Sequence, residues 1–360
     1  MSKPLSNRLR RARTAIRLAA GRLGPPWGGV DEEAVAQARE AGRRPDFESR
    51  LTWIMGSPRT GSTWLLRMLI DPAILAPRVP AGMRRVAGEG KRPLPGIVPV
   101  DESYLLNHIA PLRPPPPAGK QRVAGELTLN ATRREHAGYL FADAYADVWR
   151  PALRDLVLRR MHAQAVRAEV EFELDDPLVV IKEPNGSHAA GFLLSLLPSS
   201  SLIFLLRDGR DVVDSLVASL DERGWRHEAA GRGMGSEAGR LAAVRRESRY
   251  WLERTTAVQA AYDAHDPALR FRLRYEDLLR DTPVELGRLL EWLRRPRADD
   301  ELERSVAAHA FDAIPKRLTG PGKSRRAATP GLWRQNLSET EQEIMAEVMG
   351  PKLRELGYEE

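Results

Sequence analysis

The sequence contains no cysteine, which excludes a disulfide framework, thiolate catalysis and a cysteine-based zinc site. No apolar run reaches the length of a signal-peptide core or a membrane span, so we expect a cytoplasmic protein. The histidines do not follow a metal-ligand spacing, and no metal site is expected. What is present is an ordinary globular composition, with 42% hydrophobic and 29% charged residues.

The folded body also lacks an excess of basic charge, although the whole chain has a formal net charge of +7. Residues 1–30 contain seven basic residues and no acidic one. The other 49 basic residues therefore balance the 49 acidic ones, which argues against a nucleic-acid partner. Apolar residues recur within 1–30 near helical spacing. This segment is interpreted either as a solvated basic tail or as an amphipathic helix that makes weak peripheral membrane contact.

Short apolar runs alternate with helical patterns along the rest of the chain. Residues 51–56, 178–182 and 201–206 have the continuous apolar character of strands buried on both faces. The resulting β-α-β-α order predicts an α/β fold with a doubly wound, mainly parallel central sheet flanked by helices, formed as one domain over residues 45–360. Further elements are expected as helices over 186–197, 210–221, 240–265, 283–294 and 338–356 and a strand over 269–275.

Three segments are predicted to interrupt this regular pattern. Between Pro72 and Pro117 lie 11 of the 27 prolines, so residues 72–120 are expected to be irregular and to help shape a site. Residues 139–168 indicate one or two helices, broken near Pro151. A glycine-rich stretch at 231–239 is interpreted as a flexible lid.

The turn after the first predicted strand has the frame of a phosphate-binding loop. Residues 56–63 read GSPRTGST, with two glycines spaced as in that motif, between a strand and a helix. Backbone N–H groups at such a helix start face an anion. The lysine of nucleotide hydrolases is replaced by Ser62, and the basic residue comes earlier, as Arg59. This shift disfavours a nucleoside triphosphatase.

A second basic cluster follows the strand that ends at Leu206. Arg207 lies at the carboxyl end of that strand, where open α/β sheets bind ligands. Ser215 comes eight residues later, two helical turns into the next predicted helix. Two separate anion sites predict a ligand that carries two phosphate-like groups.

These motifs resemble those of the PAPS-dependent sulfotransferase family, in its bacterial and P-loop-like form. The segment PRTGSTW at 58–64 is similar to the family's 5′-phosphosulfate loop, and Arg207 with Ser215 is similar to its 3′-phosphate signature. The segment YEDL at 275–278 matches as well. RAATPGLW at 326–333 is similar to the family's closing loop but has two alanines where the family has lysine and glycine. The matches run in order from residue 51 to 333.

The resemblance implies transfer of a sulfuryl group from PAPS to a hydroxyl or amine of a small-molecule or glycan acceptor, with release of PAP and without a metal. It implies catalytic roles for Arg59 and Lys182, the latter stabilising charge at the transferred sulfur. It also implies that the nucleotide is bound by Arg59, Thr60, Gly61, Ser62, Thr63, Trp64, Arg207, Ser215, Tyr275, Arg325 and Arg326.

The general base is predicted to be Glu102, which lies within the proline-rich segment and is similar to the loop carboxylate that some branches of the family use. Glu183, His188 and His108 remain alternatives. Two other functions also remain open from the residues: a P-loop kinase of the nucleotide or sugar class, and a non-catalytic nucleotide-binding module. The kinase would require a lysine at position 62 and an acid that holds Mg²⁺.

Overall fold

The computed structural model describes residues 47–69, 97–101, 141–172, 177–220, 235–314, 316, 319–320, 323 and 328–358. Within them five strands form one sheet in the order β2-β3-β1-β4-β5. The strands are β1 (Leu51–Met55), β2 (Ile97–Asp101), β3 (Leu178–Lys182), β4 (Ser201–Leu206) and β5 (Arg270–Arg274). The pairings of β3 with β1 and with β2 are parallel. The predicted α/β fold with a mainly parallel sheet is confirmed.

The strand order places β1 in the middle of the sheet, with later strands added on both sides of it. The chain therefore reverses its direction of winding at β1, and such a switch point is where open α/β sheets bind ligands. Every residue of β1 and of β3 is buried, as the continuous apolar runs predicted. The loop that follows β1 thus starts from a rigid strand in the core.

The helices lie close to the predicted ranges, with boundaries that differ by a few residues. The described helices are α3 (Ser62–Leu69), α6 (Ala146–Phe172), α7 (Ala190–Leu196), α8 (Gly209–Leu220), α10 (Glu237–Ala264), α11 (Tyr275–Arg280), α12 (Thr282–Trp292), α13 (Asp299–His309), α14 (Trp333–Asn336) and α15 (Glu339–Glu355). The short helices α11 and α14 and the longer α13 were not predicted. Within the described residues, no helix has both the length and the apolar composition needed to cross a bilayer.

The interior of the proline-rich segment differs from the prediction of irregular structure. Ile97–Asp101 forms strand β2, which pairs in parallel with β3 and is the last strand on its side of the sheet. Pro99 lies inside it. An edge strand tolerates proline because one row of its backbone N–H groups has no neighbouring strand to bond. The rest of the segment, 72–96 and 102–120, lies outside the described residues.

Helix α6 was predicted to break near Pro151 and does not. It runs unbroken from Ala146 to Phe172, with the proline in its second turn. One face of the helix buries a row of apolar side chains at intervals of four residues: Trp149, Leu153, Val157, Met161 and Ala165. Burial of such a row outweighs the cost of about 3 kcal/mol for an interior proline, since each large side chain contributes roughly 1.5–3 kcal/mol.

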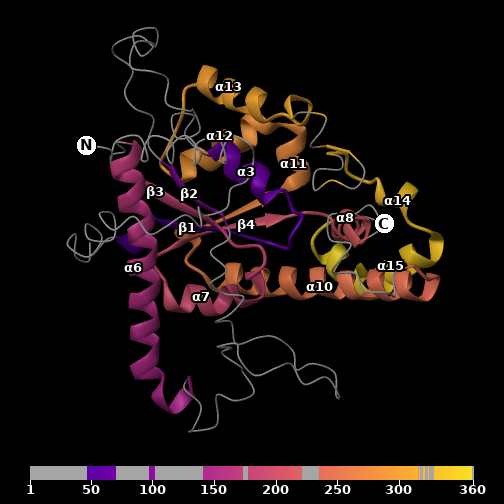
Figure 1. Ribbon diagram of the computed structural model, residues 1–360, viewed down its shortest axis with the longest axis horizontal. Helices are drawn as coiled ribbons and strands as arrows, with labels where there is room; N and C mark the ends of the chain where they lie inside the picture. Colours follow the sequence, from indigo (N-terminus) through magenta and orange to yellow (C-terminus); the bar gives the residue numbers. More distant parts are fainter. Residues whose placement is uncertain are drawn as a thin grey trace, which may run out of the picture. The chain divides into compact units, whose positions relative to one another are not determined.

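The described chain divides into two compact units. The first contains the described residues up to Ile54, between 65 and 183, and 192–202; the second contains 55–64, 184–191 and the described residues from 203 on. In the second unit α10 and α15 run side by side (Figure 1). The single domain over 45–360 stays a prediction, and residues 1–30 lie outside the described residues.

Candidate functional site

The loop between β1 and α3 has a backbone that only its particular residues allow. Gly61 has a φ of 89° and Arg59 a φ of 76°, both in the left-handed region that most side chains avoid. A Cβ atom on Gly56 would lie 2.1 Å from the carbonyl oxygen of Leu205. The two glycines of the motif are therefore required by close approach at the first position and by backbone conformation at the second.

Ser187 holds the first residue of this loop. The Gly56 N–H donates to Ser187 Oγ at 3.0 Å, and Ser187 Oγ donates to the Gly56 carbonyl at 2.8 Å. Ser187 is fully buried in a short 3-10 turn that precedes α7. Sequence reasoning missed this residue, because a serine 131 positions away gives no local signal of the contact.

The two anion motifs predicted from separate segments lie together in the second unit. Arg59 Nε donates to Ser215 Oγ at 3.0 Å. Arg207 Nη1 donates to the carbonyl of Arg59 at 2.9 Å. The structure therefore brings two guanidinium groups and the hydroxyl of Ser215, in the second turn of α8, into one cluster.

The ring of Tyr275 packs against this cluster. The Arg207 guanidinium lies over its ring at 4.4 Å, and Trp64 packs edge-on against it at 5.9 Å. A Cβ on Gly61 would lie 2.6 Å from Tyr275 Cδ2, so the loop rests directly on the ring. Burial raises the pKa of Tyr275 above its usual value of 10.0, and the nearby Arg207 charge only partly opposes this. The residue is therefore a neutral phenol whose ring supports both motifs.

Trp64 is half-buried and is not part of the apolar face of α3. Its indole N–H donates to the carbonyl of His309 at 3.0 Å. The buried face of the helix consists instead of Leu65, Leu66, Met68 and Leu69.

Two hydroxyls of the loop after β1 and one nitrogen of Arg207 are buried without a hydrogen-bond partner in the described part of the chain. They are Ser57 Oγ, Thr60 Oγ1 and Arg207 Nε. A buried donor without a partner costs roughly 1–3 kcal/mol, so such atoms usually mark a place where a ligand or water completes the structure. Hydroxyl donors, two guanidinium groups and a helix start together suit an anion.

Lys182 and Glu183 lie in the first unit, at the carboxyl end of β3. Lys182 is level with Ile54 of β1 and with Asp101 of β2 in the parallel registers, and its side chain is buried. The Glu183 N–H donates to the Ile54 carbonyl at 3.0 Å, and the residue is fully buried. His188 is buried in the second unit, beside Ser187. Glu102, His108, Arg325, Arg326 and residues 231–234 of the expected lid lie outside the described residues.

Two acids of α8 accept hydrogen bonds from the end of the segment that resembles the closing loop and from the residues that follow it. The Gly331 N–H donates to both carboxylate oxygens of Asp211 at 3.0 Å, and Asn336 Nδ2 donates to Asp214 at 3.0 Å. The Arg210 guanidinium lies over the Trp333 ring at 4.6 Å. Asp211 and Asp214 are three residues apart, and that spacing was the signal of a common helix face that sequence reasoning left unused.

The acid Asp211 makes the stability of this region depend on pH. Burial raises the pKa of Asp211 above 3.8, while the hydrogen bond from Gly331 and the charge of Arg207 lower it less. Because the folded protein holds this proton more tightly than the unfolded chain does, the contribution of Asp211 to the free energy of unfolding decreases as pH rises from about 3.8 through the raised pKa.

The substitution Asp211→Asn is therefore expected to raise the free energy of unfolding at pH 7, because the amide oxygen still accepts from Gly331 and no charge is buried. Urea denaturation at several pH values measures this, and the difference from the wild type should shrink toward pH 3.8. A variant less stable than the wild type at pH 7 would contradict the interpretation.

Comparison with known proteins gives one family match. The model described as "Sulfotransferase family" matches residues 52–300. No curated protein matches the chain.

Within the described residues, no cluster of three or more His, Asp or Glu is arranged to hold a metal ion.

The solved structures that are similar to this chain share little sequence identity with it. The sulfotransferase domain from the curacin biosynthetic pathway is 18% identical, over 86% of this chain and 97% of that one, with a TM-score of 0.40. Sulfotransferase STF9 from Mycobacterium avium is 17% identical, over 97% and 86%, with a TM-score of 0.44. A retinol dehydratase solved with androsterone and PAP is 15% identical, over 90% and 85%, with a TM-score of 0.37.

Proposed function

Because this chain belongs to the sulfotransferase family, we propose that it binds PAPS and transfers the sulfuryl group to a hydroxyl or amine of an acceptor. The observation that carries the proposal is the contact between the two anion motifs. Arg59 touches Ser215, and Arg207 touches the backbone of Arg59. A donor with a phosphosulfate at one end and a phosphate at the other matches this pair of cations.

In this proposal the loop after β1 binds the phosphosulfate end of the donor. Arg59 contacts the 5′-phosphate and the bridging oxygen, and the loop and helix start provide N–H and hydroxyl donors from Thr60, Gly61, Ser62 and Thr63. Arg207 and Ser215 bind the 3′-phosphate, with Arg325 and Arg326 as further ligands outside the described residues. Trp64 and Tyr275 lie beside the adenine. The Arg207 guanidinium already covers one face of the Tyr275 ring, so we assign the stacking surface to Trp64.

The chemistry is an in-line displacement at sulfur. The bond from sulfur to the acceptor oxygen or nitrogen forms as the bond to the 5′-phosphate oxygen breaks, and the acceptor proton passes to a base. PAP leaves with the negative charge that develops on its phosphate, and Arg59 stabilises that charge. Lys182, buried at the carboxyl end of β3, is proposed to stabilise charge on the transferred sulfuryl group.

The base is proposed to be Glu102. The described alternatives are Glu183 and His188, and His108 is a further one. Glu183 is fully buried at the carboxyl end of β3. Its N–H is hydrogen-bonded to β1, so its backbone cannot shift without disrupting the sheet.

The donor half of the proposal is tested by thermal unfolding with PAP. A ligand that binds only the folded protein stabilises it by about 2.7 kcal/mol at one hundred times its Kd. PAP is therefore expected to raise the Tm in proportion to the logarithm of its concentration, and ATP with Mg²⁺ is expected to raise it less. No shift with millimolar PAP, or a larger shift with ATP, would contradict the proposal.

The acceptor is proposed to be a small molecule or a glycan. Labelled PAPS incubated with phenols, nucleosides, glycans and cell extracts identifies the class by the label that each product carries. A cytoplasmic location and weak membrane contact through residues 1–30 stay predictions.

A further inference from the structure

Two side chains form hydrogen bonds with the peptide group between Arg207 and Asp208. The indole N–H of Trp251 donates to the Arg207 carbonyl at 3.3 Å. The N–H of the next residue, Asp208, donates to Glu276 Oε1 at 2.9 Å. The peptide group that follows Arg207 therefore has both of its polar atoms bonded to side chains from α10 and α11, and its rotation is restricted.

Glu276 uses its second oxygen for the C-terminal end of the described chain. Tyr358 donates its hydroxyl to Glu276 Oε2 at 3.0 Å. Tyr358 is only 7% exposed, and the Arg274 guanidinium lies over its ring at 4.2 Å. Burial beside the Glu276 carboxylate raises the pKa of Tyr358, so it keeps the proton that it donates. Both carboxylate oxygens are thus engaged within the protein.

The first two residues of α11 act on Arg207 in different ways. The ring of Tyr275 lies under the guanidinium, while the carboxylate of Glu276 accepts from the peptide that follows the arginine. The first turn of α11 therefore contacts both the side chain and the backbone of Arg207. A long arginine side chain loses rotamer entropy when it is fixed, so an arginine whose backbone and ring contact are already fixed loses less on binding a ligand.

We propose that Glu276 is a positioning residue that holds Arg207 in the orientation needed to bind the 3′-phosphate of the donor, and that Tyr358 acts on the same site through Glu276. This rests on the proposed function, in which Arg207 contacts that phosphate. Glu276 itself touches no part of the donor. Its effect is confined to the affinity for ligands that carry a 3′-phosphate.

The test compares PAP with AMP, which lacks the 3′-phosphate, by calorimetric titration of the full chain. Glu276→Ala and Glu276→Gln both remove the negative charge, so the difference between them measures the hydrogen bond to Asp208. The alanine variant is expected to bind PAP about tenfold more weakly than the glutamine variant. AMP affinities of the two variants are expected to agree within about twofold.

Two further variants complete the design. Tyr358→Phe removes only the hydroxyl and is expected to weaken PAP binding by about two- to fivefold with AMP unchanged, even if Glu276→Ala does not fold. Asp277→Ala is the matched control, because this neighbouring acid of α11 pairs with the exposed Arg280. Its PAP to AMP ratio should equal that of the wild type.

The outcomes separate this inference from the proposed function. A wild type that binds PAP, with equal PAP to AMP ratios in the alanine, glutamine and phenylalanine variants, would overturn the positioning role alone. A wild type that does not bind PAP would overturn the proposed function, and the positioning role with it. Weakening of PAP and AMP by the same factor in Glu276→Ala would indicate a general loss of structure and would also overturn the role.

Discussion

Replacing Arg59 by alanine is expected to lower kcat/KM for PAPS by about 10³-fold. In the proposed function Arg59 stabilises the charge that develops on the leaving phosphate, and its guanidinium donates to Ser215 Oγ at 3.0 Å. No other cation of the loop replaces it, because residues 60–63 are Thr, Gly, Ser and Thr. Steady-state kinetics at varied PAPS concentrations measure the effect, and a loss in kcat as well as in KM is expected.

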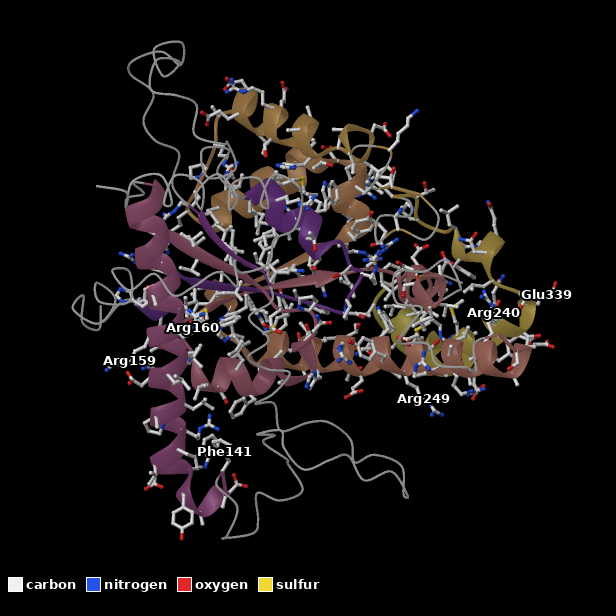
Figure 2. All side chains as sticks on the ribbon, in the orientation of Figure 1. Phe141, Arg159, Arg160, Arg240, Arg249 and Glu339 are labelled. Carbon is white, nitrogen blue, oxygen red and sulfur yellow. The ribbon has the colours of Figure 1, made fainter. Side chains whose placement is uncertain are left out.

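The matched control for this change is Arg249→Ala. Arg249 is an exposed arginine of α10 that projects from the helix surface (Figure 2). Its removal should leave kcat/KM within about twofold of the wild type. If Arg59→Ala kept kcat/KM within about tenfold of the wild type, Arg59 would have no part in transition-state stabilisation.

The sheet and the two anion motifs could be predicted from the sequence because each is encoded locally. An apolar run followed by a glycine-framed turn defines β1, its loop and α3 without knowledge of any partner. Arg207 follows an apolar strand and precedes a helix, which places it at the ligand edge of a parallel sheet. That Arg59 would touch Ser215 follows from the order of the strands, since β1 and β4 are neighbours.

The residues that support these motifs could not be predicted, because their contacts join distant parts of the chain. Ser187 is bonded to Gly56, and Tyr358 to Glu276, across 131 and 82 positions. Neither Ser187 nor Tyr358 belongs to a motif or interrupts a hydrophobic pattern. Strand β2 was missed for a different reason: its proline reads as irregular structure unless the strand is known to lie at an edge.

The base could not be singled out from the sequence for a physical reason. The basicity of a carboxylate depends on its burial and its charged neighbours, and neither is encoded in the residue type. Glu183 shows this, because a residue that reads as an ordinary strand-end acid is fully buried. A pattern of residue types predicts where phosphates bind, because many donors contribute, but it does not select one acid among several.

The substitution Gly56→Ala is expected to lower the free energy of unfolding by about 4 kcal/mol or more. A Cβ at this position would lie 2.1 Å from the carbonyl oxygen and 3.2 Å from the carbonyl carbon of Leu205. These are backbone atoms of the buried strand β4, so no side-chain rotation relieves the clash. The N–H and the carbonyl of Gly56 are both bonded to Ser187, and any shift of the loop breaks those bonds as well.

A glycine without such neighbours provides the comparison. Gly191 is exposed in the first turn of α7, and a Cβ there would meet nothing within 4 Å. Gly191→Ala is therefore expected to raise the free energy of unfolding by about 0.5–1 kcal/mol, because alanine loses less backbone freedom on forming a helix. Denaturant titration of both variants measures the contrast. If Gly56→Ala were as stable as the wild type, the loop could not approach β4 as closely as described. The backbone of Arg59 would then lie in a different place, and the contact of its side chain with Ser215 would need another explanation.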